Sequence, residues 1–543
     1  MSLSEGTKNC DGLKHQEQLG LYAAIASLSY VFWVVGAMEM VERLAFYGVK
    51  TVAALYAKDP VSEGGLGVSL SEFGNILMVW ALIQSILPVF TGGLSDRYGY
   101  KETIFCSTIV KIMGYLVMAW YPSYYGFFAG AILLAAGTAI FKPGIQGTLV
   151  KATNLQNSSV AWGIFYQTVN IGGFLGPLVA GLLRKMEWSY VFYACAGLIS
   201  LNFILLLCYT EVGKEERLQR LSTDVDQKSL WQESIHELSK PHVWSYLAVF
   251  SGFWFMFNAL FDVLPVHIDE WVNTEDIVRT FFPSGASENP WINFFVVMDE
   301  TGTSIQPEGM LNFNAGMIML TCFIVAYFSG HMRATTSMVI GTLLSVCALL
   351  VFGSTNTGWA CLLGIAIFSF GEMLSSPKFS EFMGNFAPQD KKAMYLGFSQ
   401  IPLAIGWTLE GKLGPMLYDH YSSKERFSRE LIEEKFTNGH LSGFSSENIS
   451  FLSESLNQDP ALLTGMLQKT PEEMVALIPQ GEGFEWLVAL TGEAANDLTH
   501  QLYMSHNIGF VWYIMAVVGA ISAMGIAAYG RWLKILLEAP KAS

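Results

Sequence analysis

Long apolar runs recur along the chain, and they restrict its fold more than any other feature. Many separate stretches of about 20 residues are almost wholly apolar, beginning with residues 21–38. A helix of that length spans the hydrocarbon core of a bilayer. Of the 543 residues, 52% are hydrophobic and only 14% are charged, whereas soluble domains hold about 25% charged residues. The sequence therefore predicts an all-α membrane protein.

The apolar runs form twelve expected spans, six on each side of a polar segment. Residues 211–240 are too rich in charge to cross a membrane, so they are expected to link two halves. The expected spans are 21–57, 71–93, 102–120, 124–150, 160–183, 187–210, 243–268, 309–330, 335–353, 358–385, 392–417 and 506–533. The expected units are a tail at 1–20, a six-helix bundle at 21–210, a linker at 211–241, a second six-helix bundle at 242–535 and a tail at 536–543.

Basic residues favour one orientation of these spans. If both termini are inside, the cytoplasmic segments carry Arg97, Lys101, Lys151, the basic residues of the linker, Arg333, Lys391, Lys392, Arg531 and Lys534. Arg184 and Lys185, in an outside loop, run against this trend. The positive-inside rule therefore predicts that both tails are cytoplasmic.

Two polar insertions interrupt the second predicted bundle, at residues 270–308 and 419–505, and the span count places both outside. The second contains two helix-start signals. Asp459 precedes Pro460, and Thr470 precedes Pro471 with Glu473 positioned to complete a capping box. A small external cap and a solvated, partly disordered excursion both fit this composition.

Several classes of site have no support in the sequence pattern. The seven cysteines show neither metal-ligand spacing nor a disulfide framework, and no basic stripe indicates nucleic acid. Residues 1–20 are polar and lack a signal-peptide pattern, so the first span is expected to insert without cleavage. No nucleophile motif or phosphate loop is present. We expect no enzyme activity, no metal, no cofactor and no nucleic-acid partner.

A polar face lies inside the first predicted span, where ionised groups are costly. Residues 39, 42, 43, 46, 47 and 50 recur at steps of three and four, which places them on one side of a helix. Glu39, Glu42, Arg43 and Lys50 are the ionisable members. Each charge at mid-bilayer costs about 2.5–3.5 kcal/mol, so we expect this face to line a protein interior or a water-filled cavity.

The segment between the second and third spans gives a first family resemblance. It reads Gly-Gly-Leu-Ser-Asp-Arg-Tyr-Gly-Tyr-Lys over residues 92–101 and resembles the G-x-L-A-D-R-x-G-R-K loop of the major facilitator superfamily. The resemblance makes Gly92, Asp96, Arg97 and Gly99 the gating loop. It implies two six-helix bundles around a midplane site that alternates its access.

Five segments, in order, resemble the proton-dependent oligopeptide transporters. Residues 39–48 resemble the E-x-x-E-R-F-x-Y-Y-G signature of that family. Residues 371–377, followed by Ala387-Pro388, resemble its G-E-x-x-x-S-P and A-P elements. The other three are Phe141-Lys142-Pro143-Gly144, residues 165–172 (family pattern F-Y-x-x-I-N-x-G) and Phe253-Trp254. The resemblance covers both halves but neither insertion, and it implies a peptide symporter driven by protons.

The residue types in these segments suit a zwitterionic substrate. Arg43 and Lys142 are intramembrane cations that suit a carboxylate, Arg as a planar fork and Lys as a point charge. Glu372 is an intramembrane carboxylate of the other half and suits an ammonium group. A zwitterion held at both ends would bridge the two halves. Hydrogen bonds are expected from Asn170 and Asn314, with Asn312 as the competing choice for the latter.

Proton coupling is expected from buried carboxylates. Glu39 and Glu42 lie beside Arg43, where burial and pairing both act on the protonation equilibrium. The coupling candidates are Glu39, Glu42, Glu372 and Asp262. A static salt-bridge cluster is the alternative for the first two. Tyr47 and Trp254 either line the pocket or pack between helices.

The chain departs from the family pattern in the expected pocket. Leu44 replaces a usual Phe, and Phe46 replaces the first Tyr of Tyr-Tyr-Gly. Four residues after Trp254 the family usually places an acidic residue, whereas this chain has Asn258, which does not titrate. Asp262 lies one helical turn further along and is the expected substitute.

The sequence thus predicts a proton-coupled symporter that imports di- and tripeptides or related zwitterions. We expect it to work as a monomer in the plasma (inner) membrane, with protons, the substrate and the bilayer as its partners. Two alternatives remain open. One is transport of another carboxylate-bearing solute or nitrate, and the other is a nutrient receptor that does not transport. Glu372 favours an ammonium-bearing substrate over a bare anion.

Overall fold

Twelve long helices make up most of the structure, a computed structural model. It describes residues 21–154, 157–211, 214–215, 236, 238–283, 285–299, 301–386, 398–439, 441, 446–456 and 458–538. Within these residues, the helices of 20 or more residues are α3 (Tyr30–Lys50), α5 (Leu70–Tyr98), α6 (Tyr100–Trp120), α7 (Tyr124–Ala152), α8 (Ser158–Arg184), α9 (Trp188–Leu207), α12 (Pro241–Asp262), α16 (Pro307–Gly330), α17 (Ala334–Ser354), α18 (Gly358–Phe386), α20 (Gln400–Tyr421) and α27 (Phe510–Glu538).

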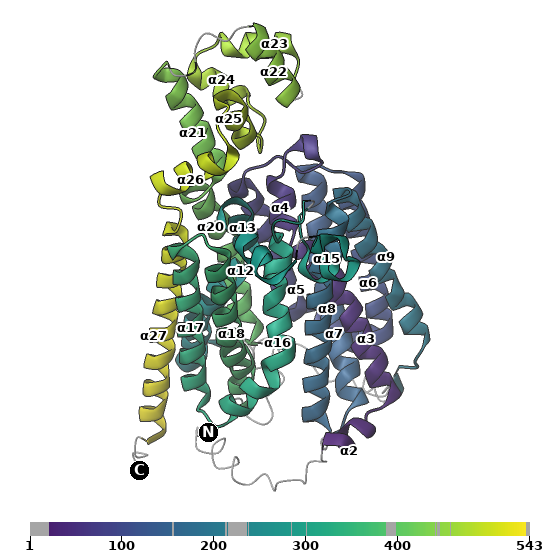
Figure 1. The fold of residues 1–543 in the computed structure, drawn as a ribbon. Helices are drawn as coiled ribbons and strands as arrows, with labels where there is room; N and C mark the ends of the chain where they lie inside the picture. Colours follow the sequence, from purple (N-terminus) through teal and green to yellow (C-terminus); the bar gives the residue numbers. More distant parts are fainter. Residues whose placement is uncertain are drawn as a thin grey trace.

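These helices form two six-helix bundles that lie side by side (Figure 1). Helices α3 and α5–α9 form the N-terminal bundle, and α12, α16–α18, α20 and α27 form the C-terminal one. The bundles meet where α5 packs against α20 and α8 packs against α16. Eight of the helices are long and apolar enough to cross a membrane by length and composition. The predicted fold class, an all-α membrane protein with two six-helix bundles, is confirmed.

Several predicted spans have different ends in the structure, the first two among them. The first, expected at 21–57, is divided into α2 (Leu21–Ala26), α3 and α4 (Ala53–Lys58). Ser29 starts α3 because its hydroxyl accepts the amide of Phe32 at 3.3 Å. The second, expected to end at residue 93, continues as helix to Tyr98. It stops at Gly99, whose φ of 118° is strained for any residue with a Cβ.

Close helix packing in the N-terminal bundle depends on glycine. A Cβ on Gly172 would lie 2.5 Å from the carbonyl oxygen of Met40, and one on Gly176 would lie 2.5 Å from that of Leu44. Both glycines are on α8, and both contacts are with the backbone of α3. Because these two glycines have no side chain, α8 can approach the polar helix α3 closely.

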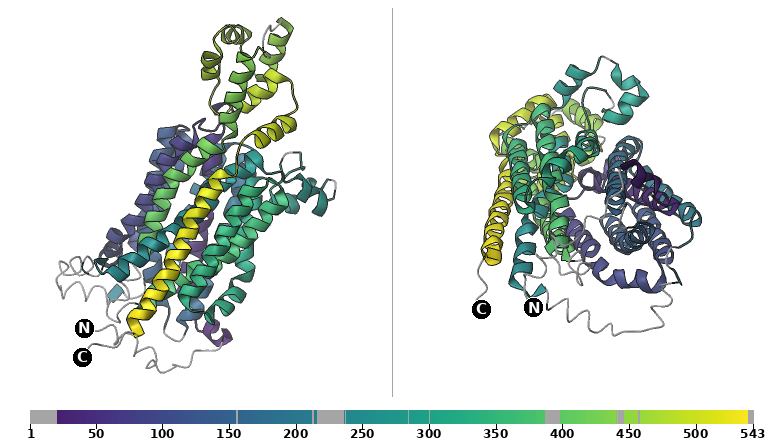
Figure 2. Two further views of the ribbon diagram at one scale, coloured as in Figure 1. Left: turned by 90° about the vertical axis from the view of Figure 1, so that its left-hand side faces the viewer. Right: turned by 90° about the horizontal axis from the view of Figure 1, so that it is seen from below.

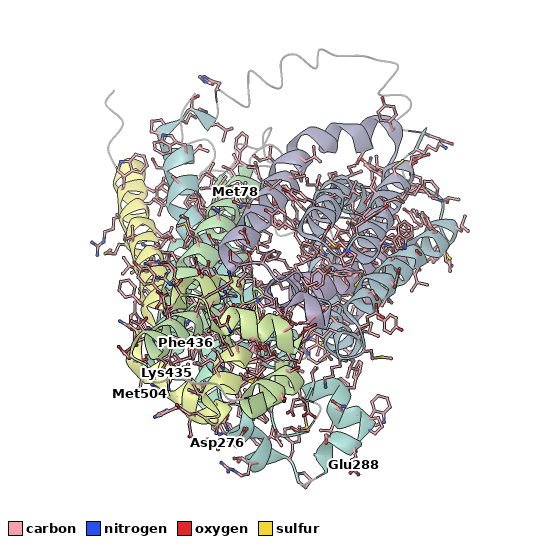
Figure 3. All side chains as sticks on the ribbon, turned by 90° about the horizontal axis from the view of Figure 1, so that it is seen from above. Met78, Asp276, Glu288, Lys435, Phe436 and Met504 are labelled. Atoms are coloured by element: carbon pink, nitrogen blue, oxygen red, sulfur yellow. The ribbon has the colours of Figure 1, made fainter. Side chains whose placement is uncertain are left out.

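The second insertion forms a helical cap at one end of the bundles (Figures 1 and 2). It contains α21 (Lys424–Thr437), α22 (Ser446–Leu456), α23 (Pro460–Leu467), α24 (Pro471–Leu477), α25 (Gly483–Thr491) and α26 (Ala495–Ser505). The two predicted helix starts are confirmed. The Asp459 carboxylate accepts the amide of Ala461 at 2.7 Å, and the Thr470 hydroxyl accepts that of Glu473 at 3.3 Å. Seen from the cap side, the cap, labelled at Lys435, Phe436 and Met504, lies over the C-terminal bundle (Figure 3).

The first insertion lies beside the cap, where its residues Asp276 and Glu288 are labelled (Figure 3). It follows α13 (Leu264–Trp271) and contains α14 (Glu275–Phe281), the 3₁₀ turn η2 (Ala286–Glu288) and α15 (Pro290–Val296). A second 3₁₀ turn of the same length, η1 (Val61–Glu63), follows α4 in the N-terminal half. Helix α15 packs against both α8 and α16, so this insertion contacts both bundles.

Candidate functional site

The polar face of α3 is buried inside the N-terminal bundle. Arg43 donates to Glu42 and lies 3.3 Å from a carboxylate oxygen of Glu39, and its guanidinium stacks over the Phe46 ring at 4.9 Å. All three ionisable side chains are buried. The expectation that this face turns towards a protein interior therefore agrees with where it lies.

Lys111 of α6 completes this cluster, and the sequence analysis did not single it out. Its ammonium nitrogen lies 2.7 Å from Glu42 Oε1 and 4.0 Å from the centre of the Phe141 ring. Only 1% of Lys111 is exposed. The sequence could have indicated this residue, because a lysine in the middle of an apolar run is costly to bury in a membrane, as are the charges on α3.

Lys142 lies near the cluster but outside its ion pairs. It is half-buried on α7 and within electrostatic reach of Arg43, Glu39 and Glu42. No carboxylate of the described residues lies within ion-pair distance of its ammonium group. Its ammonium group thus has no carboxylate partner there, whereas Arg43 is shared between two carboxylates. Neither side chain lines the cavity between the bundles.

A small cavity of about 50 Å³ lies between the two bundles. The N-terminal bundle contributes Tyr47, Thr51, Val169, Asn170, Gly173 and Pro177, and the C-terminal bundle contributes Phe257, Phe261, Leu311, Asn312, Asn314, Ala315, Ile318 and Glu372. The expected site residues Tyr47, Asn170, Asn314 and Glu372 therefore meet here. Aromatic rings face each other across it, with Tyr47 and Phe261 centred 5.9 Å apart.

Glu372 is the carboxylate of this cavity. Asn314 donates to Glu372 Oε2 at 3.2 Å and to the Ser369 hydroxyl at 2.9 Å. Asn312 also lines the cavity, and its Oδ1 is buried without a hydrogen-bond partner among the described residues. Thus Asn314 orients the carboxylate, while Asn312 offers an unused acceptor.

Trp254 does not line the cavity in this conformation. Its ring packs edge-on against Phe253, Phe257 and Trp407 on the C-terminal side. Asn170, in contrast, lines the cavity while it donates to the carbonyl of Tyr166 at 2.9 Å. Of the two readings of Trp254, its position favours packing between helices.

A third polar cluster joins the bundles nearer the cap. Lys50 of α3 lies 2.5 Å from Asp262 of α12. The amide nitrogen of Asn258 lies 2.5 Å from Asp262 Oδ2 and 2.5 Å from Oε2 of Glu410 on α20. The sequence analysis named Asn258 and Asp262 but missed Glu410, although a carboxylate inside the eleventh expected span carried the same signal as Glu372.

Further contacts between the bundles lie at the cap side. Lys58 lies 2.5 Å from Asp269, and Arg184 forms an ion pair with Glu308. Asp59 follows Lys58 in the chain. Burial raises the pKa of the Asp59 carboxyl group to about 7, although the positive charge of Lys58 acts in the opposite direction. In the described part of the chain, these ion pairs thus join the two bundles at the cap side.

The predicted gating loop is described only in part. Residues 92–98 belong to α5, and Gly99 forms the break between α5 and α6. The side chains of Asp96 and Arg97 lie outside the described residues, as does the Ala387-Pro388 element. The Gly99 backbone, which only glycine adopts without strain, is the part of this motif that the structure explains.

The sequence profile of the Major Facilitator Superfamily matches residues 22–409, most of the chain. The chain belongs to the Major Facilitator Superfamily. It is therefore a multi-pass integral membrane protein and a secondary transporter rather than an enzyme. The two bundles around a central cavity are the arrangement that this superfamily uses for alternating access.

Similar proteins within the superfamily differ in what they are named for. Peptide transporter YePEPT of Yersinia enterocolitica is 26% identical over 207 residues, which are 37% of this chain and 39% of that protein. Multidrug resistance protein MdtH of Proteus mirabilis is 21% identical over 354 residues, 64% of this chain and 78% of that protein. The match to the first-named relative thus spans about two-fifths of its length.

Among solved structures, the crystal structure of peptide transporter POT in complex with sulfate superposes with a TM-score of 0.60 and 14% identity. The superposition covers 95% of this chain and 99% of that chain. At this identity the likeness concerns the fold. It places this superfamily member among transporters with the same two bundles.

Proposed function

We propose that this superfamily member is a proton-coupled symporter for small peptides or related zwitterions. The observation that carries the proposal is the position of Glu372. It is an intramembrane carboxylate, oriented by Asn314, that faces a cavity shared with Tyr47 and Asn170 of the other bundle. A buried carboxylate in a ligand cavity favours a cationic group, and the α-ammonium of a peptide is such a group.

The carboxylate end of the substrate would bind in the N-terminal bundle. Lys142 has no ion-pair partner among the described residues and is the first candidate. Arg43 is held by Glu39 and Glu42 in this conformation. A proton on either glutamate would weaken that hold and free the guanidinium for the substrate carboxylate. Proton binding and substrate binding would then favour the same state, which is the requirement for coupling.

In the proposed transport cycle, the conformational change is the opening and closing of the two bundles at the cap side. The Lys50–Asp262, Lys58–Asp269 and Arg184–Glu308 pairs join the two bundles there. We propose that these pairs open to admit substrate and re-form when it has bound. The cycle then continues by release on the opposite side.

The same proposal assigns an orientation. The start of α2 and the end of α27 lie at the end of the bundles opposite the cap (Figure 1). With both termini cytoplasmic, as the basic residues predict, the cap and the first insertion lie outside a plasma (inner) membrane. Each chain contains one complete pair of bundles, so we propose that the monomer is the working unit.

The likeness to YePEPT supports peptides as the substrate. Because the chain is also similar to MdtH, a multidrug resistance protein, the identity of the substrate needs a direct test. We suggest competition against uptake of a labelled dipeptide into proteoliposomes. The competitors are an unlabelled dipeptide, its N-acetylated form and nitrate. Loss of a charge-assisted hydrogen bond costs about 1.5–3 kcal/mol, so acetylation is expected to weaken competition about 10- to 100-fold.

The variant Glu372→Gln identifies the group that recognises the ammonium. It is expected to bind the free dipeptide about 10- to 100-fold more weakly and to lose most of the discrimination against the acetylated form. The matched control is Glu433→Gln, which changes an exposed carboxylate on α21 of the cap. Nitrate that competes as well as the dipeptide would contradict the peptide assignment. Binding without flux would instead indicate a receptor.

A further inference from the structure

We propose that Glu410 is a proton-binding site of the cap-side gate, and that Asn258 bridges it to Asp262, so that the pair binds a second proton when the Lys50–Asp262 ion pair breaks. The site is a carboxyl pair bridged by one amide. The transport part of this inference rests on the proposed symport, whereas proton binding itself does not.

Glu410 is buried without a countercharge. None of it is exposed, and no cation of the described residues lies within ion-pair distance. Its Oε2 accepts from Asn258 Nδ2 at 2.5 Å, while Oε1 has no hydrogen-bond partner among the described residues. An ionised carboxylate in such surroundings is costly enough that the group takes up a proton instead. Glu410 is therefore neutral in this conformation.

The charged side chains that face Glu410 offer its proton no more favourable binding site. Asp262 of α12 and Lys50 of α3 are the ionisable side chains around it. On α20 itself, Lys412 is directed away, to the side-chain oxygen of Asn75 on α5 at 2.7 Å. The described residues of α27 contribute no charged contact. One cation thus faces two carboxyl groups, and a single proton balances the three.

Geometry decides which carboxyl group carries that proton. Lys50 lies 2.5 Å from Asp262, so Asp262 keeps the negative charge and Glu410 keeps the proton. The Asn258 amide nitrogen has two hydrogens and contacts one carboxyl group with each. An aspartate at position 258 would instead place three carboxyl groups around one lysine. Besides Asp262, the acidic residue of this cluster is thus at position 410, and position 258 holds an amide instead.

The packing around Glu410 leaves room for this group. A Cβ on Gly414, one turn further along α20, would collide with Glu410 Oε1. The glycine therefore provides the space in which the unpaired oxygen lies.

Opening of the gate changes the proton balance of the pair. When α3 separates from α12, Lys50 leaves and Asp262 loses its only cation among the described residues. The pair then takes up a second proton from the outer solution, so that both carboxyl groups are neutral. Closure re-forms the ion pair and releases one proton from Asp262. In the proposed symport this proton leaves on the opposite side together with the substrate. Proton uptake and gate opening therefore favour each other, which is reciprocal linkage.

Infrared difference spectroscopy tests the proton on Glu410 without any substrate. In purified protein at neutral pH, Glu410→Gln is expected to lose a protonated-carboxyl band that the wild type shows. Glu433→Gln, the exposed cap control, is expected to keep it. Glu410→Met, which also removes the carboxyl group, serves as a second variant if the glutamine variant does not fold. A wild-type spectrum without such a band, or a band that survives both substitutions, overturns the inference.

Transport then tests the coupling. In proteoliposomes, Asp262→Asn removes the carboxyl group that exchanges a proton when the gate moves. It is expected to retain substrate exchange but to lose at least half of the increase in uptake that acidification gives the wild type, whereas Glu410→Gln, a neutral replacement for a group that stays protonated, is expected to keep that increase. An unchanged pH profile in Asp262→Asn overturns the coupling. If the wild type takes up no peptide but the infrared band behaves as expected, the proposed cargo fails and the proton site stands. If peptide uptake is acid-driven but the band is absent, the proton site fails and the symport stands.

Discussion

Glu42 shows how a charged residue becomes tolerable inside a membrane helix. It is 1% exposed, and both of its oxygens are paired, one with Lys111 at 2.7 Å and the other with Arg43. The Thr138 hydroxyl adds a long hydrogen bond at 3.4 Å. Two ionised partners offset the desolvation of the carboxylate, and removal of one leaves a buried charge with incomplete compensation.

Lys111→Met is therefore expected to lower the free energy of unfolding by about 3–5 kcal/mol, measured by thermal unfolding in detergent. In Lys111→Met/Glu42→Gln, the uncompensated charge is gone as well. The double variant is expected to lose less stability than the sum of the two single variants. Strictly additive losses would show that the two side chains are not coupled.

Asp59 lies outside the spans, and its raised pKa gives a pH-dependent stability. The pKa of this carboxyl group is 3.8 in the unfolded chain and about 7 in the folded one. Between these values the folded state binds more protons, so stability falls as pH rises through this window. Asp59→Asn removes the cost and is expected to raise Tm more at pH 8 than at pH 5. An equal increase at both values, against Glu433→Gln as control, would contradict this cause.

Residue patterns predicted which charged side chains are buried on α3, but not which side chains of other helices contact them. The three- and four-residue steps on α3 identified Glu39, Glu42 and Arg43 correctly as one buried face, because helix geometry is local. The partners of that face are on other helices. Lys111 and Glu410 were not predicted because the family motifs do not include them, although each is a charged residue within an expected span.

At the scale of elements, contact between α3 and α8 depends on small residues. Gly176→Ala would place a Cβ 2.5 Å from the Leu44 carbonyl oxygen, and the helices would have to move apart. We expect a loss of about 1–3 kcal/mol in unfolding free energy. The matched control is Gly197→Ala on α9, where a Cβ meets nothing within 4 Å. The control is expected to be neutral or stabilising by about 0.5–1 kcal/mol, since alanine favours helix.

Helix number was predictable because bilayer thickness imposes it, whereas helix ends depend on local capping. Apolar length gave twelve spans, and twelve long helices are present in the described residues. The break between α2 and α3 follows from the Ser29 cap, a weak signal inside an apolar run. The cap helices began where Asp459 and Thr470 indicated, because those signals stand in polar sequence.

At the scale of the whole molecule, the cap-side ion pairs set the balance between closed and open states. Asp262→Asn removes the buried carboxylate that holds Lys50 and is expected to increase the open population at the cap side. Spin labels at the exposed residues Val61 and Phe281 would report this as longer distances in electron double resonance.

The control for that measurement lies within the cap. Lys435→Gln breaks the pair with Glu493, which does not join the bundles. It is expected to leave the distance distribution unchanged. If Asp262→Asn also leaves the distribution unchanged, the Lys50–Asp262 pair does not hold the gate.

Proton-coupled symport requires that a proton gradient drives peptide movement through this protein. Labelled dipeptide uptake into proteoliposomes, with the outer solution more acidic than the lumen, measures this directly. We predict accumulation above the external concentration, abolished by a protonophore. Uptake that only equilibrates, or that is the same with and without the gradient, would contradict proton-coupled symport.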